Sequence, residues 1–293
     1  MMALTMVGDA ANKLRAYWTL TKSLQTGLLL MTGIAGYMSA RCPTRDAQSL
    51  LSLAGSLFLA IAGSTVLNMV YDRDIDALMQ RACRRPLPSG RTSVREALLL
   101  GIILSIVGVA WAVAQSPLYG AVVFAGWFFD AVVYTLWLKR RTAWSIVWGG
   151  IAGAMPVLAG RVFGTGEIDL VGILLALSVL LWIPTHILTF SIKYADQYRA
   201  AGVPVFPNTY GVWVTRVMLA LSTGAAVIAM LLAAWHIRIP WNFFHIALWL
   251  GVALLGITIL SIVRQSPKLN LALYKMASLY MLGSMVLIML GVA

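Results

Sequence analysis

Nine long apolar stretches, separated by short polar segments, are the feature that most constrains how this chain can fold. Each is roughly 20 residues long, the length that a helix needs to cross the hydrocarbon core of a bilayer. They lie near residues 21–40, 47–70, 94–114, 117–137, 143–163, 169–192, 214–235, 240–263 and 272–292. The pattern predicts an all-α polytopic membrane protein with nine transmembrane helices around a central cavity.

The composition agrees with a lipid bilayer as the surrounding medium. Of the 293 residues, 60% are hydrophobic and only 11% are charged, whereas a soluble domain of this length needs far more polar surface. The net charge of +12 could suggest nucleic acid as a partner. The basic residues, however, sit in short clusters between the apolar stretches, so we expect no nucleic-acid binding.

The distribution of the basic residues predicts the orientation in the membrane. If the N-terminus is cytoplasmic, all but four of the 22 Lys and Arg residues fall on the inner side. The four on the outer side are Arg41, Arg45, Arg161 and Arg238. This positive-inside bias predicts nine helices with the N-terminus inside and the C-terminus outside.

The chain is predicted to form a single transmembrane domain over residues 1–293. Residues 1–20 carry charges and no long apolar run, so they are predicted to be an interfacial segment and not a cleaved signal peptide. The two longest inner loops, residues 71–93 and 193–213, each contain a stretch rich in Pro and Gly. Because they also hold most of the clustered polar residues, they are predicted to be cytoplasmic catalytic loops.

Three acceptor side chains mark the point where the second apolar stretch enters its loop. Asn68, Asp72 and Asp76 are four residues apart, and this spacing places them on one face of a helix. Ionised groups at the edge of hydrocarbon are costly and usually functional. The arginines that follow, Arg81 and Arg85, are also four apart and suit phosphate oxygens. The combination predicts a divalent cation such as Mg²⁺ bridging the acceptors to phosphate; the alternative is a solvated helix end.

A second polar cluster follows the sixth apolar stretch. It comprises Lys193, Tyr194, Asp196, Tyr198 and Arg199, of which the two tyrosines share a helix face. Their phenols can donate to phosphate oxygens. An aromatic belt at the membrane interface, which ordinarily contains Tyr and Lys, explains the same residues equally well.

Three further polar residues lie in or beside the apolar stretches. Lys139 begins a basic run that ends the fourth stretch, and Asp130 lies about two turns deeper, where it must face a cavity or a partner. His186 lies in the sixth stretch and is either a hydrogen-bonded core histidine or a group near an acceptor, such as a ligand to an iron porphyrin. No role follows from the sequence for Asp130.

These motifs resemble those of the UbiA superfamily of intramembrane prenyltransferases, which have nine helices and an Asn-x-x-x-Asp-x-x-x-Asp first motif. The match spans nearly the whole chain. It includes Asn68-Met-Val-Tyr-Asp72-Arg-Asp-Ile-Asp76, Arg85-Pro-Leu-Pro-Ser-Gly90, Tyr134-Thr-Leu-Trp-Leu-Lys-Arg-Arg-Thr142, Gly149-Gly-Ile-Ala-Gly-Ala-Met-Pro156, Lys193-Tyr194 and Tyr198-Arg-Ala-Ala-Gly-Val-Pro204. Within the superfamily the chain is most similar to the branch that farnesylates heme, because most other branches have aspartates where Tyr194 and Tyr198 stand.

The resemblance implies transfer of a farnesyl group from farnesyl diphosphate to a vinyl group of protoheme IX (heme b), with water quenching the resulting cation, in a prokaryotic plasma membrane. It implies that Mg²⁺ is held by Asn68, Asp72 and Asp76. It implies diphosphate binding by Lys22, Arg81, Arg85, Lys139 and Lys193. It implies catalytic roles for Asp72, Asp76, Tyr194, Tyr198 and Lys139. It also implies that His186 contacts the acceptor.

The chain departs from the pattern of that branch at four positions. Thr185 and Ile187 stand where a proline and a phenylalanine usually flank the histidine, Ser23 replaces a proline after Lys22, and Gln197 stands where an acid usually precedes the second tyrosine. An aromatic quinone precursor or a lipid alcohol is therefore an alternative acceptor. An alternative of a different class is a proton-coupled transporter that uses Asp130 and His186, although the clustering of charges at one rim of the membrane disfavours it.

Overall fold

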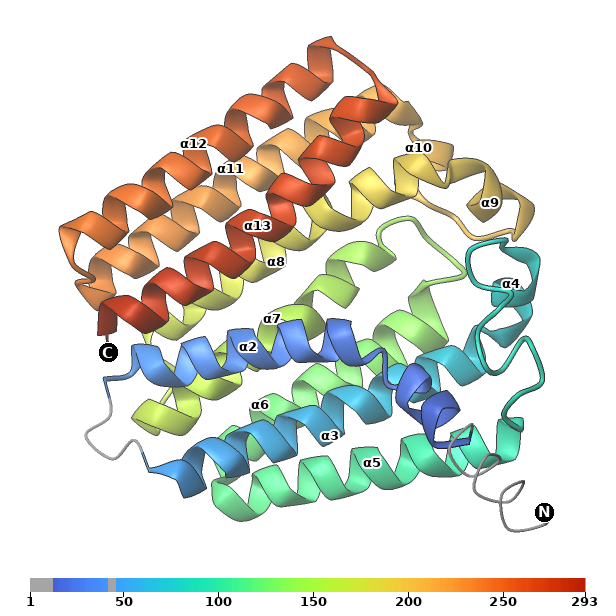
Figure 1. Ribbon diagram of the computed structural model, residues 1–293, viewed down its shortest axis with the longest axis horizontal. Helices are drawn as coiled ribbons and strands as arrows, with labels where there is room; N and C mark the ends of the chain where they lie inside the picture. The colour runs from blue at the N-terminus through green and yellow to red at the C-terminus, as the bar shows by residue number, and fades with distance from the viewer. Residues whose placement is uncertain (1–12, 42–45, 293) are drawn as a thin grey trace, which may run out of the picture.

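The computed structural model describes residues 13–41 and 46–292, and these ranges form a helical bundle without a strand (Figure 1). Residues 13–20 are helical, and the rest of the predicted interfacial segment lies outside the described residues. The long elements are α2 (Ser23–Ser39), α3 (Ala47–Tyr71), α5 (Val94–Gln115), α6 (Pro117–Phe128) with η1 (Phe129–Leu138), α7 (Ser145–Thr165), α8 (Leu170–Lys193), α11 (Gly211–Ile237), α12 (Trp241–Val263) and α13 (Pro267–Val292). The short ones are α4 (Arg73–Leu78), α9 (Ala195–Ala200) and α10 (Phe206–Thr209).

Several helices begin where a polar side chain caps the first turn. Ser93 and Glu96 form a reciprocal capping box at the start of α5, with N to O distances of 3.1 and 3.2 Å. Asp169 accepts from the backbone N–H of Gly172 at 2.8 Å at the start of α8. These caps explain why the helix starts lie close to the predicted boundaries.

Glycines bring α2 into close contact with α7. A methyl group at Gly160 would overlap the carbonyl oxygen of Gly33, and one at Gly36 would overlap the carbonyl oxygen of Val157. Small residues allow this close backbone approach between helices in membranes. The contact holds α2 firmly in the bundle.

The long helices form a closed ring in chain order, and α13 returns to pack against α2. Two groups of buried apolar residues fill the spaces beside α7, one toward α3 and α6 and one toward α11 and α13. Between them lies a cavity of about 830 Å³ that is lined by residues of α2, α3, α6, α7, α8 and α13. The predicted central cavity is therefore present.

Eight of the helices within the described ranges are long and apolar enough to cross a membrane: α3, α5, α6 with η1, α7, α8, α11, α12 and α13. With 17 residues, α2 is shorter, so the ninth crossing stays a prediction. Figure 1 shows α4, α9 and α10 together at one end of the bundle. Arg41 donates to the carbonyl of Arg238 (2.9 Å), and Arg161, near the end of α7, donates to the carbonyl of Ser39 (2.5 Å), so these three arginines lie close together. Their place on the outer side of the membrane stays a prediction, and Arg45 lies outside the described residues.

The fourth apolar stretch differs from the prediction of one regular helix. After Phe128 the backbone widens into a π-helix that continues to Leu138. π-helical turns within α-helices are frequent at functional sites. This change sets the position of Asp130, Thr135 and Lys139 relative to α3.

Candidate active site

The three acceptors lie at the junction of α3 and α4. Asp72 ends α3 and precedes α4 with φ −85° and ψ 0°, so the helix is interrupted there. The N–H of Asp72 still bonds to the carbonyl of Asn68 at 2.9 Å, and the N–H of Asp76 bonds to that of Asp72 at 2.8 Å. The helical spacing therefore continues through the junction. All three side chains line the cavity and are at most 6% exposed.

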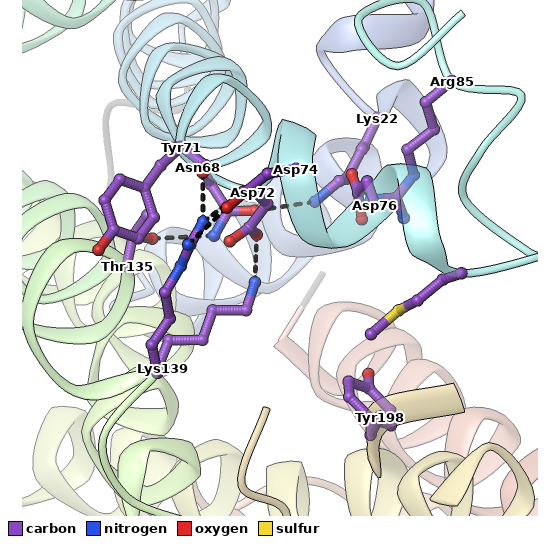
Figure 2. A network of polar contacts seen from close by, with 12 residues as sticks. Lys22, Asn68, Tyr71, Asp72, Asp74, Asp76, Arg85, Thr135, Lys139 and Tyr198 are labelled. Atoms are coloured by element: carbon purple, nitrogen blue, oxygen red, sulfur yellow. Dashed lines mark hydrogen bonds and ion pairs between the residues drawn. The ribbon is translucent and has the colours of Figure 1, made fainter. Parts of the chain in front are cut away.

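Each acceptor has a cationic neighbour. Lys139 forms an ion pair with Oδ2 of Asp72, Arg85 pairs with Oδ2 of Asp76 at 2.7 Å, and Nζ of Lys22 lies 3.5 Å from Oδ1 of Asn68. Figure 2 shows these side chains converging on the acceptors. Burial acts to lower the pKa of Lys139, but Tyr134 and Asp72 outweigh it and the pKa is raised. The cluster thus balances buried negative charge with fixed positive charge, which burial requires.

Asp74, between the two buried aspartates, faces the other way. Its side chain is 59% exposed and forms two hydrogen bonds with Arg140, at 2.6 and 2.8 Å. These bonds hold the pKa of Asp74 below its usual value. Asp74 is two residues from Asp72, which is about 200° round a helix, and the structure accordingly separates it from the site.

The donor set fits Mg²⁺ bound together with phosphate. Oδ1 of Asp72 is buried and has no hydrogen-bond partner among the described residues, so one carboxylate oxygen is left for a ligand. No cluster of three or more His, Cys, Asp or Glu occurs within the described ranges. Two carboxylates and an amide match the way Mg²⁺ is usually held, by one or two carboxylates plus substrate phosphates and water.

Arg81 joins the two polar loops. Its Nη2 donates to the hydroxyl of Tyr198 at 2.8 Å, and its guanidinium lies 4.9 to 5.5 Å from the ring centres of Phe190, Tyr194 and Tyr198. Cation–π contacts and a charge-assisted hydrogen bond stabilise this arrangement. Arg81 and Tyr198 both line the cavity. The structure thus brings the predicted second cluster to the same rim as the acceptors.

Two residues of the second cluster lie apart from the cavity wall. Among the described residues, that wall includes neither Tyr194 nor Lys193. Tyr194 packs on Phe190 at 4.6 Å, and Lys193 is exposed, with its Nζ 5.0 Å from the Tyr194 ring. Asp196 is 96% exposed, so it does not take the place of the acid that Gln197 replaces. The roles expected for Tyr194 and Lys193 stay predictions.

His186 lines the cavity on α8. Its ring stacks between Trp182 and Tyr274, with centroid distances of 5.0 and 4.4 Å, and its Nδ1 lies 3.3 Å from Oγ of Ser278. These neighbours fix the ring plane.

Of the four departures in sequence, Ile187 lines the cavity, whereas Thr185 and Ser23 do not touch it. Thr185 is fully buried and shares a 2.6 Å hydrogen bond with Thr223, away from the cavity wall. Ser23 begins α2, and among the described residues it is its neighbour Lys22, not Ser23, that belongs to the wall. These substitutions thus alter packing and a helix start rather than the surface that an acceptor would meet.

Some partners of the site were not found from the sequence. Thr135 accepts from the amide of Asn68 at 2.8 Å, and Phe190, Tyr274 and Ser278 hold Arg81 and His186 as described. The position of Thr135 depends on the π-helix, and Tyr274 and Ser278 belong to a helix with no motif of its own. No local pattern could have indicated them.

Comparison with known proteins assigns the chain to a family. Residues 29–280 match the model of the UbiA prenyltransferase family. The chain therefore belongs to this family and is an integral membrane prenyltransferase. Among its relatives is the protoheme IX farnesyltransferase of Korarchaeum cryptofilum, which is 44% identical over 75% of this chain and 74% of that protein. The protoheme IX farnesyltransferase of Archaeoglobus fulgidus is 41% identical over 80% of this chain and 82% of that protein.

Solved structures share the fold. A structure of digeranylgeranylglyceryl phosphate synthase aligns with a TM-score of 0.80 at 20% identity and covers 96% of this chain and 98% of that one. A UbiA homologue from Archaeoglobus fulgidus bound to GPP and Mg²⁺ aligns with a TM-score of 0.69 at 18% identity and covers 93% and 99%. Family membership favours a prenyltransferase over the proton-coupled transporter.

Proposed function

We propose that this chain transfers the farnesyl group of farnesyl diphosphate to a vinyl group of protoheme IX, giving heme O and diphosphate, with Mg²⁺ as cofactor. The observation that carries the proposal is the buried set Asn68, Asp72 and Asp76, flanked by cations at the polar end of a cavity whose wall is otherwise mainly apolar. An allylic diphosphate likewise has a charged diphosphate head and an apolar prenyl tail. The names of the relatives support heme as the acceptor.

In this proposal the acceptors hold Mg²⁺, which neutralises charge on the departing diphosphate when it is bound. Lys22, Arg81, Arg85 and Lys139 bind the diphosphate oxygens and keep it at the rim. Lys193 and Tyr194 support them from outside the cavity wall, and Tyr198 orients Arg81. The apolar part of the cavity holds the prenyl tail and keeps water from the first cation.

His186 is proposed to contact the porphyrin. The imidazole stacks between Trp182 and Tyr274, lies near Ser278 and belongs to the cavity wall, which supports a contact with an acceptor there. His186→Ala is expected to reduce the formation of farnesylated heme strongly. The dissociation constant of farnesyl diphosphate should change by less than about threefold. Equal losses in both assays would contradict a porphyrin-facing histidine.

The protein is proposed to cross a prokaryotic plasma membrane nine times, with α2 as the first crossing, the N-terminus inside and the site open to the cytoplasm. The distribution of basic residues supports this orientation. Labelling of single cysteines introduced into the described loops tests it. If the Ser89→Cys variant reacts with an impermeant reagent added outside intact cells, the orientation is opposite to the one proposed.

An aromatic quinone precursor or a lipid alcohol is the alternative acceptor. Its support came from Thr185 and Ser23, which lie outside the cavity wall, so no observation in the site favours it. The decisive assay is release of diphosphate from farnesyl diphosphate by the purified protein. The proposal expects release that requires Mg²⁺ and heme b; release that is indifferent to heme but requires an aromatic acceptor would replace heme as the substrate.

A further inference from the structure

Two pairs of side chains connect the end of α3 to the end of η1 at successive depths. Lys139 pairs with Asp72, and Thr135 accepts from the amide of Asn68. Asp130 precedes Thr135 by five residues on η1 and lies beside Ser64, which precedes Asn68 by four residues on α3. These pairs fix the depth of each residue relative to the acceptors.

Asp130 accordingly lies about one helical turn, or about 5 Å, deeper than Asn68, the innermost of the three acceptors. It lines the cavity and is partly accessible from it. Among the described residues of the cavity wall, it is the one carboxyl outside the first motif (residues 68–76). A carboxyl at this depth is costly and indicates function.

In the proposed reaction the new carbon–carbon bond forms at about that depth. If diphosphate is held at the acceptors, the carbon bonded to it, C1 of the prenyl group, lies just below them. The residues beyond Asp130 on this side of the cavity are apolar, among them Leu57, Ile61 and Val123. Asp130 is therefore the carboxyl of the wall nearest to the reacting carbons below the acceptors, and Ser64 and Tyr134 are polar neighbours in the same wall.

Proton balance in the proposed reaction requires a base. The C1–O bond breaks and its electron pair leaves on diphosphate, while the vinyl π pair forms the new C–C bond. The positive charge then lies on the carbon attached to the porphyrin ring, and a lone pair of water forms the C–O bond. The oxygen becomes neutral only when one O–H proton leaves and its electron pair stays on oxygen.

We propose that Asp130 is the base that accepts this proton and later releases it to diphosphate or to solvent. The inference rests on the proposed function, because it needs an acceptor that is quenched by water. It assigns to Asp130 a catalytic role that is separate from the metal and diphosphate residues. Without the carboxylate, the protonated alcohol loses water again, and the cation can instead lose a C–H proton to diphosphate and give an alkene.

The test compares the products of the wild-type protein and Asp130→Asn with farnesyl diphosphate, Mg²⁺ and heme b. The variant keeps the size of the side chain but removes its basicity. We expect turnover to fall about 10²-fold, the usual contribution of a general base, with farnesyl diphosphate binding within about twofold. We also expect the product to shift from the alcohol toward an alkene that is lighter by one water.

Asp130→Glu and Ser64→Ala are the matched controls, since both keep a carboxylate near the reacting carbons. Both should keep the alcohol as the main product and lose less turnover than Asp130→Asn. If Asp130→Asn does not fold, Asp130→Glu and Asp130→Ala replace it. Slower turnover of Asp130→Glu with the alcohol as the product supports the role. Unaltered turnover of both Asp130→Glu and Asp130→Ala contradicts it.

Three results would overturn the inference. Unchanged turnover and product in Asp130→Asn would remove Asp130 from the chemistry. Loss of farnesyl diphosphate binding with an unchanged alcohol fraction would make it a structural or diphosphate-binding residue. A wild-type protein that makes no farnesylated heme would overturn the proposed function and this inference with it. Failure of the inference alone is recognised because the wild-type protein still makes farnesylated heme.

Discussion

The two polar segments at the rim of the cavity differ in how they are built. In the first motif (residues 68–76), the acceptors are almost fully buried and two of them form ion pairs with Lys139 and Arg85. In the second motif (residues 193–199), no side chain is fully buried, and Tyr194 and Tyr198 present aromatic faces and a phenol to Arg81.

The difference separates two tasks. Buried charges cannot be removed singly without leaving a desolvated partner, so the first motif is a rigid site for a metal and an anion. Aromatic faces bind a cation without carrying charge, so the second motif can position Arg81 without competing for the metal. Changes in the first motif should therefore have much larger effects than changes in the second.

The largest effect is expected for Asp72→Ala and Asp76→Ala. Each should lower turnover at least about 10³-fold, because stabilisation of the leaving group by the metal is worth several kcal/mol and about 1.4 kcal/mol is tenfold. Asp74→Ala is the matched control, since Asp74 is exposed on the other face, and it should stay within about threefold. Diphosphate release is the measurement, with membrane insertion and monodispersity checked in parallel; near-normal turnover of either buried variant would refute the metal role.

An intermediate effect is expected for Lys139→Gln, which leaves Asp72 buried without its cation. Breaking a buried ion pair costs about 3–5 kcal/mol, so thermal unfolding of the metal-free protein in detergent should shift to lower temperature. Mg²⁺ with a diphosphate should restore part of the loss, because a bound cation replaces the lost partner. Asp74→Asn, which breaks the exposed ion pair with Arg140 and leaves the contacts of Arg140 with Tyr71, should have little effect. Equal destabilisation by the two variants would show that burial does not distinguish the pairs.

The smallest effect is expected in the second motif. Tyr198→Phe removes the hydrogen bond from Arg81 but keeps the ring, and a hydrogen bond to a charged group is worth about 1.5 kcal/mol or more. We expect KM for farnesyl diphosphate to rise about tenfold with kcat nearly unchanged. Tyr194→Phe is the matched control, because Tyr194 offers Arg81 its ring face, and KM should not change. A loss of kcat in Tyr198→Phe as large as that of Asp72→Ala would place Tyr198 in the chemical step and remove the contrast between the motifs.

The sequence predicted the parts of the molecule that depend on local patterns. Apolar runs located the long helices, and the spacing of Asn68, Asp72 and Asp76 located the acceptors, because i to i+4 geometry continues through the break at Asp72. The exposed position of Asp74 followed from the same geometry. Charged residues are rare in this chain, so the clustered ones near the rim were predicted to belong to the site. Examples are Arg81, Arg85 and Lys139.

The remaining features depend on tertiary packing. The π-helix has no recognisable pattern, so the pairing of Thr135 with Asn68 and the depth of Asp130 in the cavity could not be predicted. The enclosure of Arg81 by three rings requires α8 and the loop after α4 to meet. The side to which Thr185 points depends on the rotation of α8 about its axis. Because α8 is apolar on several sides, its sequence periodicity does not determine this rotation.

The mass of the product formed from labelled farnesyl diphosphate tests the central claim most directly. Purified protein with Mg²⁺ receives heme b and an aromatic quinone precursor together, so that the acceptors compete. The account predicts one labelled product with the mass of heme b plus a farnesyl group and one hydroxyl, and none when Mg²⁺ is removed. A labelled aromatic product with heme b left unmodified would contradict it.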